Sequence, residues 1–385
     1  MTSIEALDQG TIAATPYSPL DPKNQEVRVL YLRPGHDNDE ICVRLDRMRL
    51  ANAFPYEALS YVWGTELSPK PALVNNVHYL AITQNLDCAL RHLRLPTRSR
   101  VLWIDALCIN QQDVQERSRQ VQIMDHIYSS AHQVIIWLGP DHGHNYHNVL
   151  LHMDKRMVPD SNTLFVQLLR DICRLGSSPW FSRLWVVQEL VLATDDPMVY
   201  IGRYRIPWSD FASGADHFNY WFWKDSKSGF DVDDKALIRD FMVQHAGIRS
   251  FNELRLSTKQ APLATRLYRT IFQQATDPRD KIYGLLAMSQ SPTNNIKPDY
   301  TLSIQRVLAQ TTAVLLQDRW SALYSCFPLH YMRDEDSPRF KKIQDLPSWV
   351  PDMTLQSKLN RQELDEQEQY WKPQTLLRGS EGQKT

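Results

Sequence analysis

A cluster of polar side chains follows a short apolar run near residue 104, and it is a place where the chain is expected to do chemistry. Residues 101–104 are continuously apolar, which is typical of a strand buried on both faces. Asp105, Cys108 and Asn110 follow directly, before the next helical pattern. Ligands of open α/β sheets bind outside the carboxyl ends of such strands. We therefore expect Asp105 and Asn110 to lie at a binding edge.

Each of these residues also has a structural interpretation. Asp105 and Asn110 are residue types that cap helices, and a helix is expected to start near Gln112. Cys108 is better explained as a small buried side chain than as a nucleophile, because no histidine is nearby in the sequence to activate it.

A second strand ends in residues that could contact a ligand. Residues 56–63 have a strong strand pattern, and Gly64 after them permits a tight turn. Ser60, Tyr61 and Trp63 lie at the end of this strand. Packing explains Tyr61 and Trp63 at least as well as stacking on a ligand does.

The elements that must position these residues alternate between strands and helices. Residues 134–138 form another apolar run, closed by a Gly-Pro pair, and an amphipathic helix is expected over 114–131. Strands that alternate with helices predict right-handed crossovers and a mostly parallel sheet. The fold class is therefore α/β, with helices flanking a mostly parallel sheet.

Two hairpins are expected beside this sheet. The runs at 26–32 and 40–45 are separated by turn-forming residues and predict a hairpin on the edge of the sheet. The run at 73–82 has Asn75-Asn76 between two short strand patterns, which predicts a second hairpin.

The chain is expected to have two folded parts with less ordered ends. Residues 1–25 are an extended lead-in with three prolines, residues 26–202 form the α/β domain, and residues 203–354 form a mainly helical region. Residues 355–385 are polar and are expected to be a flexible tail.

Charge and composition limit the classes of partner. Lys and Arg number 43 against 44 Asp and Glu, so no overall field attracts nucleic acid or an anionic membrane. The five cysteines are widely spaced without a C-x-x-C pair, which favours a reducing compartment. With no secretory signal pattern and no apolar stretch long enough to span a bilayer, we expect a soluble, cytoplasmic protein.

A metal site is not expected. His142, His144 and His147 are close in sequence, but they follow a Gly-Pro turn and lack a frame of carboxylates or cysteines. No resident cofactor is expected either. The chain has no phosphate-binding G-x-x-x-x-G-K-[ST] loop, so it is not expected to sense a nucleotide by that means.

Several ordered motifs resemble the fungal heterokaryon incompatibility (HET) domain. They are YEALSYVWG at 56–64, LWIDALCINQQD and the residues after it at 102–121, VIIWLG at 134–139 and RLWVVQEL at 183–190. DPRDKIYGLLAM at 277–288, PDY at 298–300 and LPSWVPD at 346–352 resemble segments that often follow this domain. The resemblance implies a role in non-self recognition after hyphal fusion, ending in growth arrest or programmed cell death.

The HET domain is also similar to TIR domains, some of which cleave NAD at its nicotinamide glycosidic bond. ALSYVWG resembles the first TIR strand and its loop, and LWVVQELV resembles the TIR helix with the motif W-x-x-x-E-L. This resemblance implies that Glu189 is the catalytic glutamate and that NAD is a substrate. The residues expected to contact NAD lie on these loops and this helix: Ser60, Tyr61, Trp63, Gly64, Asp105, Asn110, Arg183 and Trp185.

Glu189 has its own structural alternative, and Trp185 would shape its pocket. Glu189 could anchor a structural network through Arg183 or Arg203. Trp185 and Glu189 are four residues apart on a helix, so we expect the indole to wall a pocket into which the carboxylate points.

Two functional hypotheses follow. In the first, the protein is an NAD glycohydrolase whose activity rises on self-association. In the second, it is a non-catalytic adaptor or recognition module that acts through a protein partner of an incompatibility system. The second is favoured by Val186, which stands where plant TIR domains often have a cysteine, and by the long helical second half.

Overall fold

The computed structural model describes most of the chain. The described residues are 15–224, 234–257, 261–270, 273–289 and 296–318, with 343, 345–347, 350 and 353. The predicted tail at 355–385 and residues 1–14 of the predicted lead-in lie outside them, as does most of the motif at 346–352.

The described strands form one nine-stranded sheet in the order β5-β4-β2-β1-β6-β3-β7-β8-β9. Their bounds are β1 Glu26–Leu32, β2 Cys42–Arg49, β3 Glu57–Ser60, β4 Ala72–Val74, β5 His78–Leu80, β6 Arg100–Trp103, β7 Gln133–Trp137, β8 Met198–Ile201 and β9 Tyr204–Pro207. The centre of the sheet is parallel, since β3 pairs with β6 and β7, and β7 pairs with β8. The predicted α/β class is confirmed.

The four central strands have the order of a doubly wound sheet. In chain order β3 is the first of them, β6 the second, β7 the third and β8 the fourth, and across the sheet they lie as second, first, third and fourth. The strand order therefore changes direction between β3 and β7, because β6 is added on one side of β3 and β7 on the other. Ligands of such sheets bind at this point.

Both predicted hairpins are present, but one lies elsewhere in the sheet. β1 and β2 pair antiparallel, yet β1 also pairs with β6 and β2 with β4, so this hairpin is interior and the predicted edge position is wrong. The edge is instead formed by β4 and β5, whose turn contains Asn75 and Asn76 at φ +54° and +63°. Asparagine tolerates this left-handed backbone, which explains why the turn was recognisable.

Helices cover both faces of the sheet and form a second layer beyond it. Their bounds are α1 Gln84–Leu93, α2 Asp105–Cys108, α3 Val114–Gln122, α4 Met124–Ser130, α5 His147–Lys155, α6 Asn162–Gly176, α7 Trp185–Leu192, α8 Trp208–Lys224, α9 Lys235–Leu256, α10 Leu263–Arg269, α11 Asp280–Leu286 and α12 Ile304–Asp318. Short 3₁₀ turns occur at Pro22–Asn24, Leu50–Asn52 and Pro179–Ser182.

The side chains of β6 and β7 show which helices pack on which face. Trp137 on β7 donates through Nε1 to Asn85 of α1 at 3.0 Å and its ring contacts His92 of the same helix. Trp103 on β6 points the other way and packs edge-on against Tyr128 of α4, with ring centroids 5.6 Å apart. Both indoles are fully buried, so the sheet has a core on each side.

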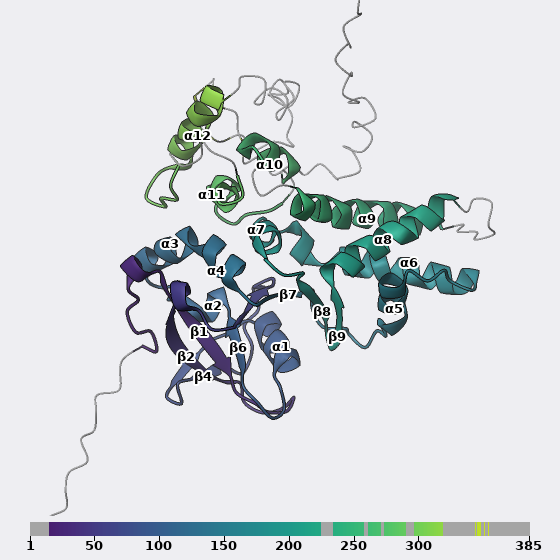
Figure 1. Cartoon of the computed structure of the whole chain (residues 1–385), viewed down its shortest axis with the longest axis horizontal. Coiled ribbons are helices and arrows are strands. Elements are labelled where there is room, and N and C mark those ends of the chain that lie inside the picture. The colour runs from purple at the N-terminus through teal and green to yellow at the C-terminus, as the bar shows by residue number, and fades with distance from the viewer. Residues whose placement is uncertain are drawn as a thin grey trace, which may run out of the picture.

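The helical second half contacts the α/β part through α7. Helices α5, α6, α8 and α9 gather beside β8 and β9, whereas α10, α11 and α12 lie across α3, α4 and α7 from the sheet (Figure 1). Helix α7 touches α4, α9 and α11 as well as β3. None of the helices within the described residues is long and apolar enough to cross a membrane.

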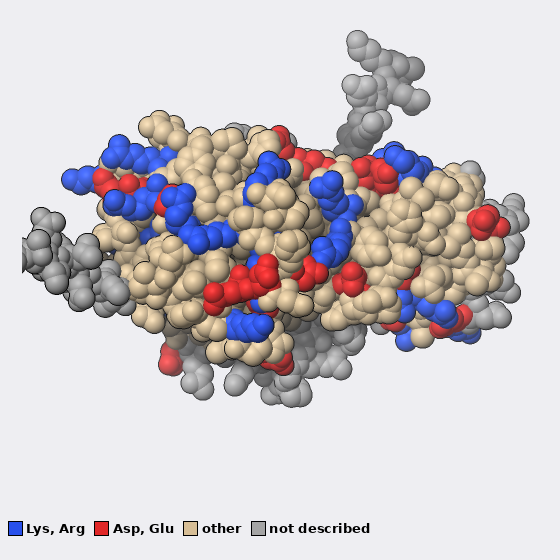
Figure 2. All heavy atoms as spheres, turned by 90° about the horizontal axis from the view of Figure 1, so that it is seen from below, with Lys and Arg blue, Asp and Glu red and all other residues tan. Residues whose placement is uncertain are grey.

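Basic and acidic side chains are intermingled on the face shown in Figure 2. Both signs occur beside one another there, with uncharged surface between them. This agrees with the nearly balanced charge of the sequence.

The contact between α5 and α8 requires a glycine, which gives a test of the fold. A Cβ at Gly214 would lie 2.5 Å from Cβ of Met153 and 2.6 Å from its Cα. We expect Gly214→Ala to lower the free energy of unfolding by ~2 kcal/mol, because this backbone must shift. Denaturant unfolding followed by circular dichroism measures the change.

Gly284→Ala in α11 is the matched control. The nearest atom to its added Cβ would be Cδ2 of Leu184 at 3.4 Å, which belongs to a flexible side chain. This variant should be nearly neutral or gain up to about 1 kcal/mol from helix propensity. Equal stability of the two variants would contradict the close packing of α5 on α8.

Candidate functional site

Polar groups collect at the carboxyl ends of β3 and β6, next to the place where the strand order reverses. Ser60 ends β3, Asp105 follows β6 at the start of α2, and Arg183 and Glu189 approach from the segment that contains α7. Arg183 Nη1 donates to the backbone oxygen of Tyr61, which ties the start of α7 to the loop after β3. The structure thus brings together residues that are more than a hundred positions apart in the sequence.

Glu189 is the only acidic residue of α7, and the helix buries it. Residues 186–192 of this helix are all buried, which follows from an apolar sequence packed between the sheet and α4, α9 and α11. Glu189 is 3% exposed, and its Oε2 has no hydrogen-bond partner among the described residues. A carboxyl group in such surroundings loses its hydration without full compensation.

Burial dominates the ionisation of Glu189. It raises the pKa of this carboxyl from its ordinary 4.5 to about 7, although attraction to Arg183 and hydrogen bonding to Ser60 and Tyr128 act in the opposite direction. Ser60 Oγ accepts from Trp180 Nε1 at 2.8 Å, so the serine hydroxyl proton is available to the carboxyl.

Asp105 is a second acid influenced by the same arginine. Burial raises its pKa, while Arg183, Trp63 and the amide of Ala106 lower it in part. Its Oδ2 accepts from Trp63 Nε1 at 2.8 Å, and its Oδ1 accepts from the Ala106 amide at 2.7 Å. Two carboxyl groups with raised pKa values therefore lie within the field of one guanidinium, and Glu189, with a pKa of about 7, can hold and release a proton near neutral pH.

The capping role considered for Asp105 and Asn110 is wrong for helix α3. Asp113 caps that helix, accepting from the amides of Gln115 and Glu116. Asn110 Oδ1 accepts from the Gln112 amide at 3.2 Å and so shapes the loop before the helix. Cys108 is buried, and its surroundings raise the thiol pKa to about 12, which agrees with a packing role.

Trp185 does not form the expected wall beside Glu189. Its indole Nε1 donates to Asp280 Oδ2 at 3.0 Å, so the ring is directed to α11. Tyr300 donates to the other oxygen of Asp280 at 2.6 Å. The helical spacing predicts that Trp185 and Glu189 lie on the same side of α7, but the long indole reaches the second half of the chain. Arg203 is also remote, because it pairs with Asp37 at 2.6 Å on the surface.

A cavity of about 500 Å³ lies beside this buried cluster. Of the predicted residues, Tyr61, Trp63 and Asn110 line it, whereas Ser60, Gly64, Asp105, Arg183, Trp185 and Glu189 do not. Gly64 has φ +74°, in line with a tight-turn role.

Two of the tyrosines that line this cavity were missed from the sequence. Tyr17 belongs to the segment expected to be an extended lead-in, and Tyr79 is on β5 of the edge hairpin. An exposed tyrosine in a short hairpin gives no signal by itself that it faces a cavity.

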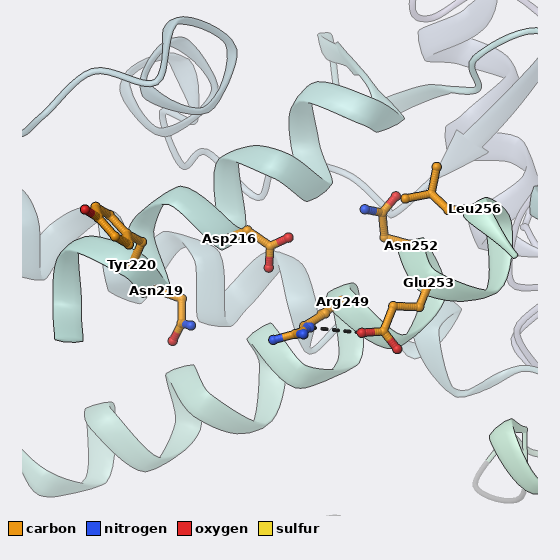
Figure 3. Close-up of a pocket in the computed structure, with 7 residues that line it drawn as sticks. All are labelled: Asp216, Asn219, Tyr220, Arg249, Asn252, Glu253 and Leu256. Atoms are coloured by element: carbon orange, nitrogen blue, oxygen red, sulfur yellow. Dashed lines mark hydrogen bonds and ion pairs between the residues drawn. The ribbon is translucent and has the colours of Figure 1, made fainter. Parts of the chain in front are cut away.

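A second cavity of about 720 Å³ lies between α8 and α9 (Figure 3). It is lined by Asp216, Asn219 and Tyr220 of α8 and by residues of α9, among them Arg249 and Glu253, which pair at 3.0 Å. None of the predicted site residues lines it. In the part of the chain that the structure describes, no three His, Cys, Asp or Glu side chains are grouped to hold a metal ion.

The raised pKa of Glu189 predicts a pH-dependent stability. Between pH 4.5 and about 7 the folded protein keeps a proton that the unfolded chain releases, so the free energy of unfolding falls as pH rises through this window. The full shift corresponds to ~3 kcal/mol. Glu189→Gln, which cannot ionise, should be more stable than the wild type at pH 8 by up to that amount and similar to it at pH 5.

Urea unfolding of both proteins at pH 5, 6, 7 and 8 measures this difference. Glu253→Gln on the exposed side of α9 is the control and should follow the wild type. A wild-type and Glu189→Gln difference that does not change with pH would contradict the raised pKa.

Comparison with known proteins identifies the domain that contains this site. Residues 56–189 match the sequence model of the family described as heterokaryon incompatibility protein (HET). The chain is similar to heterokaryon incompatibility protein 6, OR allele, of Neurospora crassa, with 29% identity over 400 residues that cover 86% of this chain. It spans 58% of the length of that relative. No solved structure matches the chain. The part of the chain that matches the HET family therefore runs from residue 56, just before β3, to Glu189 itself.

Proposed function

We propose that this protein acts in heterokaryon incompatibility, where it responds to non-self recognition by arresting growth or killing the cell. The HET domain over residues 56–189 supports this role, and so does the name of the similar Neurospora protein. The proposal includes a cytoplasmic location, where fusing hyphae mix their contents.

The observation that carries a chemical role is the unpaired carboxyl oxygen of Glu189. A glutamate kept for structure alone would be expected to have both oxygens bonded, because an unsatisfied buried polar group costs about 1–3 kcal/mol. Glu189 Oε2 has no partner among the described residues, and burial holds the pKa of the group near neutrality. Such a group is suited to proton transfer at cellular pH.

The reaction that we propose is hydrolysis of NAD at the nicotinamide glycosidic bond. The bond between ribose C1′ and the pyridinium nitrogen breaks, and its electron pair leaves with nicotinamide. Glu189 as the carboxylate stabilises the cationic ribosyl centre and takes a proton from the water that attacks C1′. The products are nicotinamide, ADP-ribose and one proton.

The site must open before this reaction can occur. Glu189 is 3% exposed and does not line the adjacent cavity, whereas Tyr61, which lines it, is tied through its backbone oxygen to Arg183. We propose that self-association moves this loop or α7 and exposes the carboxyl. Activity would then be low in the monomer and higher in the assembly.

The closed site also favours a second function, that of a non-catalytic adaptor. Helix α7 makes contact with α9 and α11 of the second half, so a partner bound there could change the position of the helix without any reaction. In this case Glu189 would tune stability, and a protein partner would execute the response.

The test measures nicotinamide release and growth in parallel. Purified wild type, Glu189→Gln and the control Glu253→Gln are incubated with NAD as monomers and after forced dimerisation, and each is also expressed in a fungal host. We expect the dimerised wild type and control to turn over NAD. The turnover rate of Glu189→Gln should be lower by at least ~100-fold, which is the size of effect expected when a proton-transfer group is removed. Growth arrest should be lost in the same variant.

Two outcomes separate the proposals. Undiminished growth arrest by a folded Glu189→Gln would rule out catalysis by this residue as the cause. Arrest by the wild type without NAD turnover in any state would favour the adaptor.

A further inference from the structure

The cavity beside Tyr61 is bounded by four segments that are distant in the sequence. They are the loop after β3, residues 78–86 from β5 into the start of α1, the stretch from α2 to Gln112, and residues 15–17. The last segment is held in place by Arg28, whose Nη2 donates to the Ser18 oxygen and whose guanidinium lies 5.0 Å from the centre of the Tyr17 ring. The volume of about 500 Å³ is within the range of small-molecule sites.

Among the described residues, no charged side chain lines this cavity. Its lining contains aromatic, aliphatic, amide and hydroxyl groups and one histidine, but no Lys, Arg, Asp or Glu. A phosphate or carboxylate placed here would lose water without meeting an opposite charge, which is costly. The lining therefore selects for an uncharged ligand.

Aromatic rings supply flat surfaces at the cavity. Trp63 is 36% exposed and Tyr79 is 61% exposed, although both are large rings that proteins commonly bury. The Trp63 indole is fixed by its hydrogen bond to Asp105, so its orientation needs no ordering when a ligand binds. Flat rings of this kind are platforms on which a planar heterocycle stacks.

Polar groups without partners complete the lining. Tyr61 is 2% exposed, yet its hydroxyl makes no hydrogen bond with any described residue. Among the same residues, the side-chain amide of Gln112 and Nδ2 of Asn110 are also free. Gln111 differs, because its Nε2 donates to the backbone oxygen of Asp105 at 2.9 Å. The free hydroxyl and amides are suited to the donors and acceptors on the edge of a heterocyclic base.

We propose that this cavity is a binding site for an uncharged planar heterocycle, a nucleobase or a nucleoside, stacked against Trp63 and Tyr79 and hydrogen-bonded by Tyr61, Asn110 and Gln112. The site recognises the base and sugar and contributes no charge to a phosphate. This inference goes beyond the proposed function, and it holds whether or not Glu189 is catalytic.

Calorimetric titration of the full chain tests the proposal. The probes are adenosine, guanosine, cytidine, uridine and nicotinamide, with NAD and ADP-ribose for comparison. We expect at least one uncharged probe to bind with one site per chain, and NAD to bind no more than about tenfold tighter than that probe.

Three variants locate the site. Tyr79→Ala removes an exposed ring at little risk to folding and should weaken binding by ~5- to 100-fold, the range expected for loss of one stacking partner. Tyr220→Ala, which removes another exposed tyrosine, on α8, should bind like the wild type. Glu189→Gln should also bind like the wild type, so a failure of the NAD reaction leaves this proposal standing.

Four results would overturn the proposal. They are the absence of binding by every uncharged probe at millimolar concentration, NAD binding much more than tenfold tighter than all of them, wild-type affinity in Tyr79→Ala, and loss of binding in a folded Glu189→Gln. The last would place the ligand at the buried acid and not in the cavity.

Discussion

Glu189 lies on a helix whose residues 186–192 are all buried, and the arrangement of the site depends on how the protein tolerates that carboxyl group. Burial favours the protonated form, while Arg183 and the hydroxyls of Ser60 and Tyr128 favour the charged form. Because these effects nearly balance at neutral pH, the group can exchange a proton without a large cost in either state. The pKa of Asp105 is subject to the same two opposing effects, since burial raises it and attraction to Arg183 lowers it.

Hydrogen bonds connect the start of helix α7 to both halves of the chain. On one side Arg183 donates to the Tyr61 oxygen after β3. On the other, the Leu184 amide donates to the Gln274 oxygen at 2.9 Å, and Trp185 bonds Asp280 of α11. A change in the contacts of the second half would therefore act directly on the helix that holds the buried acid. This coupling gives a physical route from recognition to the site under either proposed function.

Local patterns predicted the elements better than they predicted contacts. The apolar run before Asp105 and the Asn75-Asn76 turn are decided within a few residues, so the strands and the hairpin turn were recognisable. The interior place of β1 and the direction of Trp185 depend on partners far along the chain, and periodicity carries no information about them. For the same reason the sequence placed Tyr61 and Asn110 near a binding edge but missed the tyrosine from the edge hairpin, Tyr79.

The most direct test is the protonation state of Glu189 in the folded protein. Infrared difference spectra of wild type minus Glu189→Gln isolate the C=O stretch of this protonated carboxyl between pH 4 and pH 9. The structure predicts that the band persists above pH 6 and disappears with a midpoint near 7, since burial raises the pKa to about 7. A midpoint close to the ordinary 4.5 would show that water reaches the carboxyl and would contradict the account of a buried, proton-holding site.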